Sequence, residues 1–118
     1  MNKVVLITGG ARGIGSAIAL ELAKHGYDIV INYLTSKQPA KELKEKIESE
    51  YHVRCLTICA DVSDVDQVNI MVSEIEEKMG GVDILINNAA VDLSNLFHLK
   101  NAEEFKRTLD VNVVGAFN

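Results

Sequence analysis

Glycines follow the first apolar run of the chain in a pattern that suits the binding of a phosphate group. The run Val4–Thr8 leads into Gly9-Gly10-Ala11-Arg12-Gly13-Ile14-Gly15, and a helical pattern begins at once. Glycines at a turn from strand to helix let the backbone approach a phosphate, and free N–H groups and the helix dipole then point at it. The alternative is that the glycines serve only the turn, because glycine adopts positive φ without strain. Residues 8–15, called the glycine loop below, are a candidate pyrophosphate site.

The spacing within the glycine loop argues against the two commonest phosphate-binding patterns. A P-loop aligned on residues 10–15 places Ser16 where a lysine should reach the phosphates. The pattern G-x-G-x-x-G also fails, because Ile18 stands where the third glycine is needed. The pattern that remains is T-G-x-x-x-G-x-G.

Three further motifs follow the glycine loop at the expected ends of later strands. They are Asp61-Val62, then Asn87-Asn88-Ala89-Ala90, then Asp110-Val111-Asn112-Val113. Together with the glycine loop, these motifs resemble the short-chain dehydrogenase/reductase family, and within it the 3-oxoacyl-(acyl carrier protein) reductases, from Lys3 to the last residue. The resemblance implies hydride transfer between NADP(H) and a carbonyl, such as a 3-oxoacyl thioester of fatty acid biosynthesis.

Four apolar runs alternate with helical patterns along the chain, which predicts an α/β fold. Strands are predicted at Val4–Thr8, Asp28–Tyr33, 53–59 and 82–86. Strands that are apolar on nearly every residue indicate a parallel sheet buried on both faces. We expect one doubly wound, Rossmann-type domain over residues 1–118, and the resemblance implies an incomplete sheet with strand order 3-2-1-4. Right-handed crossovers then bring the motifs to the carboxyl edge of the sheet, where ligands of such folds bind.

The helices are predicted from apolar residues at helical spacing. The first ends at Gly26, the second begins near Pro39, and a capping box of Ser63 and Asp66 begins the third. A short helix is expected at 102–109 and another from Val111. The residues expected to face the core are Ile14, Ile18 and Leu22 in the first helix, Leu43, Ile47 and Tyr51 in the second, and Val65, Val68, Val72, Ile75 and Met79 in the third.

Charge and composition narrow the possible functions. A net charge of −5 without a basic cluster argues against nucleic acid or an anionic membrane as a partner. No apolar run suits a membrane span or a signal peptide, so we expect a cytoplasmic protein. Cys55 and Cys59 lie about 13 Å apart along one predicted strand, too far for a disulfide. His25, His52 and His98 lack the spacing of metal ligands.

The choice of cofactor follows from a residue type that is absent. Enzymes that select NAD commonly end the second strand with a carboxylate, which would repel a 2′-phosphate. Here Tyr33 ends that strand and no acid follows before Glu42, whereas Arg12 and Lys37 could both face the phosphate. We therefore expect NADP(H) to be the cofactor. The residues expected to bind it are Gly9, Arg12, Gly13, Ile14, Gly15, Tyr33, Lys37, Asp61, Val62, Asn88, Ala89 and Ala90.

The resemblance also implies roles for single residues. Asp61 matches a family aspartate that accepts a hydrogen bond from the adenine amino group, and its alternative is a helix cap. Asn88, Ala89 and Ala90 would lie beside the ribose and nicotinamide, although Ala90 replaces the family's usual glycine. Asn112 matches the asparagine that holds a water in the family's proton relay, and its alternative is a helix-start residue that bonds nearby backbone.

The serine, tyrosine and lysine that act in the family's reaction have no counterparts in these 118 residues. Tyr33 and Lys37 match Y-x-x-x-K, but their place near the adenosine end argues against a catalytic role. We therefore expect the cofactor-binding portion of a reductase, inactive by itself and without the catalytic and substrate-binding portion. The alternative is a non-enzymatic nucleotide-binding or sensing module. A bare sheet edge at 82–86 would favour self-association.

Overall fold

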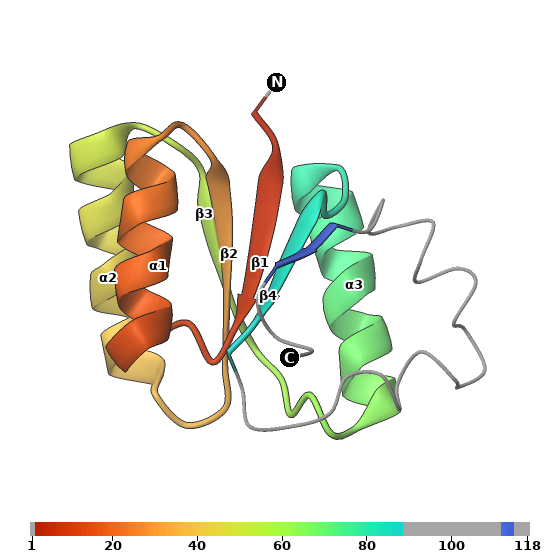
Figure 1. Cartoon of the computed structure of the whole chain (residues 1–118). Coiled ribbons are helices and arrows are strands. Elements are labelled where there is room, and N and C mark those ends of the chain that lie inside the picture. Colours follow the sequence, from red (N-terminus) through yellow and green to blue (C-terminus); the bar gives the residue numbers. More distant parts are fainter. Residues whose placement is uncertain (1, 89–111, 115–118) are drawn as a thin grey trace.

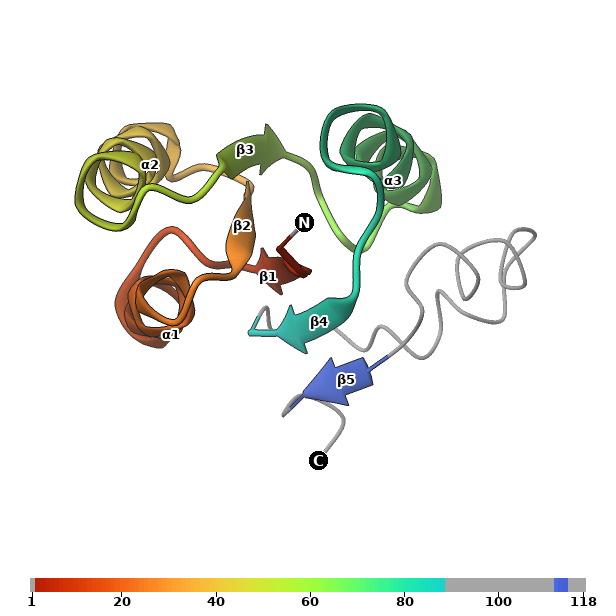
Figure 2. The ribbon, with the colours of Figure 1, turned by 90° about the horizontal axis from the view of Figure 1, so that it is seen from above.

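The computed structural model describes residues 2–88 and the backbone of 112–114. The strands pair in parallel in the order β3-β2-β1-β4-β5. Helices α1 and α2 cover one face of this sheet and α3 covers the other (Figure 1 and Figure 2). The elements in chain order are β1 (Val4–Thr8), α1 (Gly13–Lys24), β2 (Asp28–Tyr33), α2 (Lys37–Tyr51), β3 (Cys55–Cys59), α3 (Val65–Met79), β4 (Ile84–Asn87) and β5 (Asn112–Val114).

Each face of the sheet has its own hydrophobic core, and β1 contributes to both. Val4 and Leu6 belong to the core beneath α3, whereas Val5 and Ile7 belong to the core beneath α1 and α2. All five residues of β1 are buried, as expected of a central strand covered on both faces. The predicted doubly wound α/β fold with strand order 3-2-1-4 is confirmed, and β5 extends it.

Helix α1 faces the sheet with small residues. Its buried residues are Gly15, Ala19 and Ala23. Ile14 is 73% exposed, and Ile18 and Leu22 are only partly buried, so the predicted buried face is wrong by one position. Small side chains let the helix lie close to the strands, and that closeness outweighs the larger apolar area of the isoleucines. The predicted end of the helix is correct, because Gly26 follows it at a φ of 92°.

Helix α3 begins at an aspartate cap. The Asp64 carboxylate accepts the N–H groups of Asp66 at 2.9 Å and Gln67 at 3.3 Å, which satisfies donors of the first turn. The predicted capping box of Ser63 and Asp66 is wrong, since the Ser63 hydroxyl donates to Asp61 at 2.6 Å. The buried residues of α3 are Val68, Met71, Val72, Ile75 and Met79, and Val65 is half-buried.

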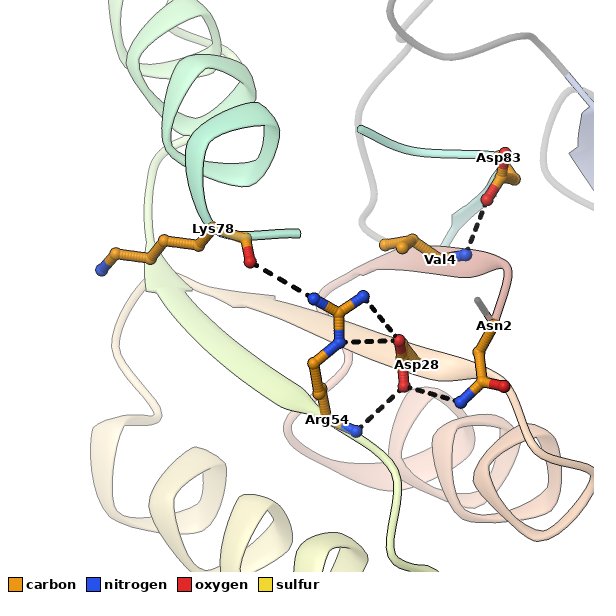
Figure 3. Close-up of polar contacts among 6 residues, drawn as sticks. All are labelled: Asn2, Val4, Asp28, Arg54, Lys78 and Asp83. Carbon is orange, nitrogen blue, oxygen red and sulfur yellow. Dashed lines mark hydrogen bonds and ion pairs between the residues drawn. The ribbon is translucent and has the colours of Figure 1, made fainter. Parts of the chain in front are cut away.

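Two strands are shorter than predicted. β3 begins at Cys55 rather than at residue 53, and β4 begins at Ile84 rather than at residue 82. At β4 the reason is Asp83, whose carboxylate accepts the N–H of Val4 at 2.8 Å (Figure 3). The N–H of Val4 therefore donates to a side-chain oxygen. In a longer β4 it would donate to a backbone carbonyl of that strand.

Strand β5 overturns the helix predicted from Val111. The backbone of Asn112–Val114 pairs in parallel with β4, with Asn112 opposite Ile84. Two of its three residues are β-branched valines, which suit a strand. β4 is therefore not the edge of the sheet, and the bare edge on which the expected self-association rests does not exist there. The helix predicted at 102–109 lies outside the described residues.

Candidate functional site

The carboxyl ends of β1, β2, β3 and β4 meet at one edge of the sheet, the lower edge in Figure 1. The predicted site segments leave the sheet there. The glycine loop begins at Thr8, the last residue of β1. Tyr33 ends β2, Asp61 lies two residues beyond β3, and Asn88 directly follows β4. The fold therefore brings together residues that are up to 80 positions apart in the chain, as parallel strands require.

The glycine loop packs so closely that Gly15 has no room for a side chain. A Cβ atom there would lie 2.7 Å from the Gly9 carbonyl oxygen and 2.7 Å from Asn88 Nδ2. Gly9 and Gly13 have φ values of 62° and 57°, so these glycines also serve the turn. The two requirements together hold the first turn of α1 directly against the end of β4.

Hydrogen bonds of Thr8 and Asn88 connect the end of β4 to the glycine loop. Thr8 Oγ1 accepts the N–H of Asn88 at 3.0 Å and donates to Asn87 Oδ1 at 3.0 Å. Asn88 Nδ2 donates to the carbonyl oxygen of Gly9 at 3.0 Å. Thr8 is buried, so water does not compete for its hydrogen bonds. Asn88 therefore contributes to the site by fixing the shape of the loop.

The N-terminus of α1 is open to an anion. Arg12 precedes the helix in extended conformation, and no side chain caps the helix or places an acid in its first turn. Uncapped N–H groups and the helix dipole together attract negative charge. Arg12 is exposed, and within the described residues its guanidinium makes no hydrogen bond or ion pair. This end of α1 has the donors and the charge to hold a phosphate.

The ends of β2 and β3 form the second part of the site. Tyr33 is half-buried, and Lys37 begins α2 as an exposed residue. Asp61 Oδ1 accepts the hydroxyl of Ser63 at 2.6 Å and its N–H at 2.9 Å. These bonds, the hydroxyl's first, lower the pKa of Asp61, which is therefore a carboxylate at neutral pH. Asp61 does not cap α3, and the side chain of Val62 is buried beneath that helix.

Three predicted site residues are not placed in the site by the structure. Ala89 and Ala90 lie outside the described residues. Asn112 is described by its backbone, which pairs with Ile84, the first residue of β4. Since β4 has three more residues before Asn88, Asn112 lies about 10 Å back from the site edge. The relay role of Asn112 stays a prediction.

Asn32 is the site residue that the sequence analysis missed. Its side chain is 3% exposed and hydrogen-bonds to the backbone of both Gly9 and Ala60. A signal existed, because Asn32 interrupts the apolar residues of Asp28–Tyr33. A buried amide must find hydrogen-bond partners.

Within residues 2–88, no three His, Cys, Asp or Glu side chains are grouped so that they could hold a metal ion. The helices in this part of the chain are too short or too polar to cross a membrane.

A family model described as "short chain dehydrogenase" matches residues 3–118, which is nearly the whole chain. The chain belongs to the short-chain dehydrogenase family. Members of this family are oxidoreductases.

Two curated relatives of the chain are reductases by name. It is 39% identical over 118 residues to the 3-oxoacyl-[acyl-carrier-protein] reductase FabG of Staphylococcus aureus, covering 100% of this chain and 48% of the relative. It is 33% identical to the acetoacetyl-CoA reductase of Paracoccus denitrificans, covering 100% and 46%. The chain thus spans about half the length of the curated relatives it matches.

Solved structures of the family share the fold. The L-sorbose reductase of Gluconobacter frateurii, crystallised with NADPH and L-sorbose, matches with a TM-score of 0.72 and 31% identity, over 92% of this chain and 46% of that one. The acetoin dehydrogenase YohF of Salmonella typhimurium matches with a TM-score of 0.69 and 35% identity, over 77% of this chain and 37% of that one.

Proposed function

We propose that this chain binds NADP(H) and forms the cofactor-binding portion of a carbonyl reductase. The observation that carries the proposal is the uncapped start of α1, held against β4 by the close approach at Gly15. The glycine loop would hold the pyrophosphate with backbone N–H groups. Asp61 and the backbone of Val62 would contact the adenine. Asn88, Ala89 and Ala90 would lie on the side of the ribose and nicotinamide.

The preference for NADP(H) over NAD(H) rests on charge at the end of β2. Tyr33 ends the strand, and the residues from Leu34 to Lys37 contain no acid that would repel a 2′-phosphate. Arg12 directly before α1 and Lys37 at the start of α2 are both exposed cations. The L-sorbose reductase that shares the fold was crystallised with NADPH, which agrees with the proposal.

For the substrate of the whole protein, we propose a 3-oxoacyl thioester. The support is the identity of 33–39% with reductases of 3-oxoacyl-(acyl carrier protein) and acetoacetyl-CoA. NADPH, when bound, supplies a hydride to the carbonyl carbon. In this reaction, the residues at the ends of β1 to β4 would bind and orient the cofactor. Asn112 is proposed to hold a water for proton transfer.

A titration tests the binding proposal. Cofactor fluorescence or calorimetry with the 118-residue chain should give a lower Kd for NADPH than for NADH. Only NADPH carries the 2′-phosphate that Arg12 and Lys37 would contact. Equal affinities would remove the cofactor preference. No binding of either cofactor would remove the proposed function itself.

An assay of turnover tests the proposal that this chain binds the cofactor and is inactive by itself. The chain alone should not oxidise NADPH in the presence of an acetoacetyl thioester, because its one Y-x-x-x-K match, at Tyr33 and Lys37, lies at the end of β2. A rate that persists through purification and disappears in Tyr33→Phe would contradict this prediction and would assign the reaction to Tyr33.

A further inference from the structure

Asn32 is a buried amide in an otherwise apolar part of the central sheet. It is the fifth residue of β2, 3% exposed, and it follows the buried Ile29, Val30 and Ile31. Removal of an amide from water costs free energy unless its donors and acceptors are satisfied. A valine or isoleucine would suit the strand better, so the contacts of the amide must account for its presence.

The side chain of Asn32 connects two segments of the site. Its Nδ2 donates to the carbonyl oxygen of Ala60 at 2.9 Å, and its Oδ1 accepts the N–H of Gly9 at 3.3 Å. The backbone oxygen of Asn32 also accepts the N–H of Gly10 at 3.1 Å. Gly9 and Gly10 belong to the glycine loop, while Ala60 directly precedes Asp61.

These two segments do not touch each other through the sheet. β1 and β3 lie on opposite sides of β2, and the register of β1 with β2 ends at Ile7 opposite Ile31. Beyond that pair the glycine loop has left the ladder. On the β1 side, the Asn32 amide therefore continues the connection where regular pairing stops. On the other side, β2 and β3 stay paired as far as Tyr33 opposite Cys59, and the N–H of Ala60 donates to the carbonyl oxygen of Tyr33 at 3.0 Å.

We infer that Asn32 is a positioning residue that holds the glycine loop at a fixed distance from the adenine segment Asp61-Val62. The inference rests on the proposed function. A dinucleotide spans both segments, so its adenosine and its pyrophosphate bind together only when the segments are in register. A ligand that contacts one segment gains nothing from the connection. The neutral amide suits this task because it donates to one carbonyl and accepts one N–H at the same time.

The test compares ligands that contact one segment with ligands that contact both. Adenosine reaches the adenine segment alone, whereas ADP also places its phosphates on the glycine loop. We would measure both affinities by NMR titration, and that of NADPH by fluorescence, in the 118-residue chain. Asn32→Leu keeps the branched heavy-atom skeleton of the side chain and removes both hydrogen bonds. Asn32→Asp keeps the shape and the oxygen toward Gly9, and in its ionised form cannot donate to Ala60.

We expect Asn32→Leu to weaken ADP and NADPH at least tenfold more than it weakens adenosine, and Asn32→Asp to show a smaller loss in the same direction. The control is Val30→Ala, which opens a cavity on the same face of β2 two residues away. It should lower the melting temperature and leave the ratio of ADP to adenosine affinity unchanged, because it removes neither hydrogen bond of the Asn32 side chain. Circular dichroism would establish that each variant is folded.

The outcomes separate this inference from the proposed function. If the folded Asn32 variants keep the wild-type ratio of ADP to adenosine affinity, or if Val30→Ala lowers that ratio equally, the positioning role is wrong and the proposed function stands. If the wild-type chain binds neither ADP nor NADPH, the proposed function fails and the inference fails with it.

Discussion

The carboxylate of Asp28 and the guanidinium of Arg54 form a two-bond ion pair (Figure 3). Asp28 is the first residue of β2, so the pair lies at the opposite end of the strands from the glycine loop. Asp28 Oδ2 lies 2.7 Å from Arg54 Nη2 and 2.9 Å from Nε. Its other oxygen accepts the N–H of Arg54 at 2.9 Å and the amide of Asn2 at 3.2 Å. Arg54 also donates to the carbonyl oxygen of Lys78 at 3.4 Å. The start of β2 is thereby tied to β3, to α3 and to the chain before β1.

Acid should weaken this connection. Burial by itself raises the pKa of Asp28, but the hydrogen bonds from Arg54 and Asn2 and the guanidinium charge outweigh burial and hold the pKa below its ordinary value of 3.8. The stabilisation is present above the unfolded pKa and is lost as pH falls through the lower pKa of the folded state. Urea unfolding from pH 7 to pH 3 should show a decreasing free energy of unfolding, with a smaller decrease in Asp28→Asn.

At pH 7, Asp28→Asn should lower the free energy of unfolding by about 2 kcal/mol, since it replaces hydrogen bonds to a charged group. The control is Glu74→Gln, which breaks the more exposed pair with Lys78 at 3.0 Å and should cost at most about 0.5 kcal/mol. Identical pH dependence in wild type and Asp28→Asn would show that this carboxylate does not govern acid stability.

Gly15→Ala should impair cofactor binding. The added methyl group would meet Gly9 and Asn88 at 2.7 Å, so the loop must shift away from the end of β4. We expect NADPH affinity to fall about tenfold or more, which is roughly 1.4 kcal/mol. Gly26→Ala is the matched control, because it adds the same methyl group at the far end of α1 with nothing within 4 Å. It should cost stability through its φ of 92° and spare the affinity. Wild-type affinity in folded Gly15→Ala would contradict the role given to the loop.

Arg12→Ala should reduce the affinity for NADPH more than that for NADH, by about 1–2 kcal/mol if the guanidinium forms a charge-assisted bond to the 2′-phosphate. Calorimetric titration of both cofactors measures this difference. Lys24→Ala, which removes an exposed cation from the other end of α1, should leave the ratio of the two affinities unchanged. An equal loss for both cofactors in Arg12→Ala would assign Arg12 to the shared pyrophosphate.

The two thiols should react at very different rates. Burial, with a smaller effect of Glu48, raises the pKa of Cys55 to about 12, while Cys59 is exposed. Because the thiolate is the reactive form, a chromogenic disulfide reagent at pH 8 should modify one thiol per folded chain quickly. Cys59→Ser should remove this fast phase and Cys55→Ser should retain it. Two fast thiols in the folded chain would show that the core beneath α2 opens readily.

How much the sequence predicts depends on whether the deciding contact is local. The strands β1 and β2 were predicted to the residue, because apolar runs bounded by turn residues are local signals. The buried face of α1 was predicted incorrectly. The helix lies close to the sheet at Ala19, and this tertiary contact favours small residues over Ile14 and Ile18. The pairing of β5 with β4 likewise depends on residues that are distant in the chain.

In the candidate site, too, the local features could be predicted from the sequence and the tertiary contacts could not. Thr8, Arg12 and Asp61 could be assigned to one sheet edge, because strand ends in a parallel sheet converge whatever the side chains are. The network through Asn32 could not, since its partners Gly9 and Ala60 become neighbours of β2 only in the folded chain.

The two buried polar residues of β2, Asp28 and Asn32, lie at opposite ends of the strand and form different kinds of contact. Asp28 and Asn32 lie four residues apart, about 13 Å along the strand, a distance at which the effects of substitutions usually add. The connection at Asp28 is ionic and should weaken in acid, while the one at Asn32 is neutral. We therefore expect that a lineage moving to a hotter or more acidic habitat can change residues around Asp28 and Arg54 without altering the nucleotide site proposed at the other end of β2.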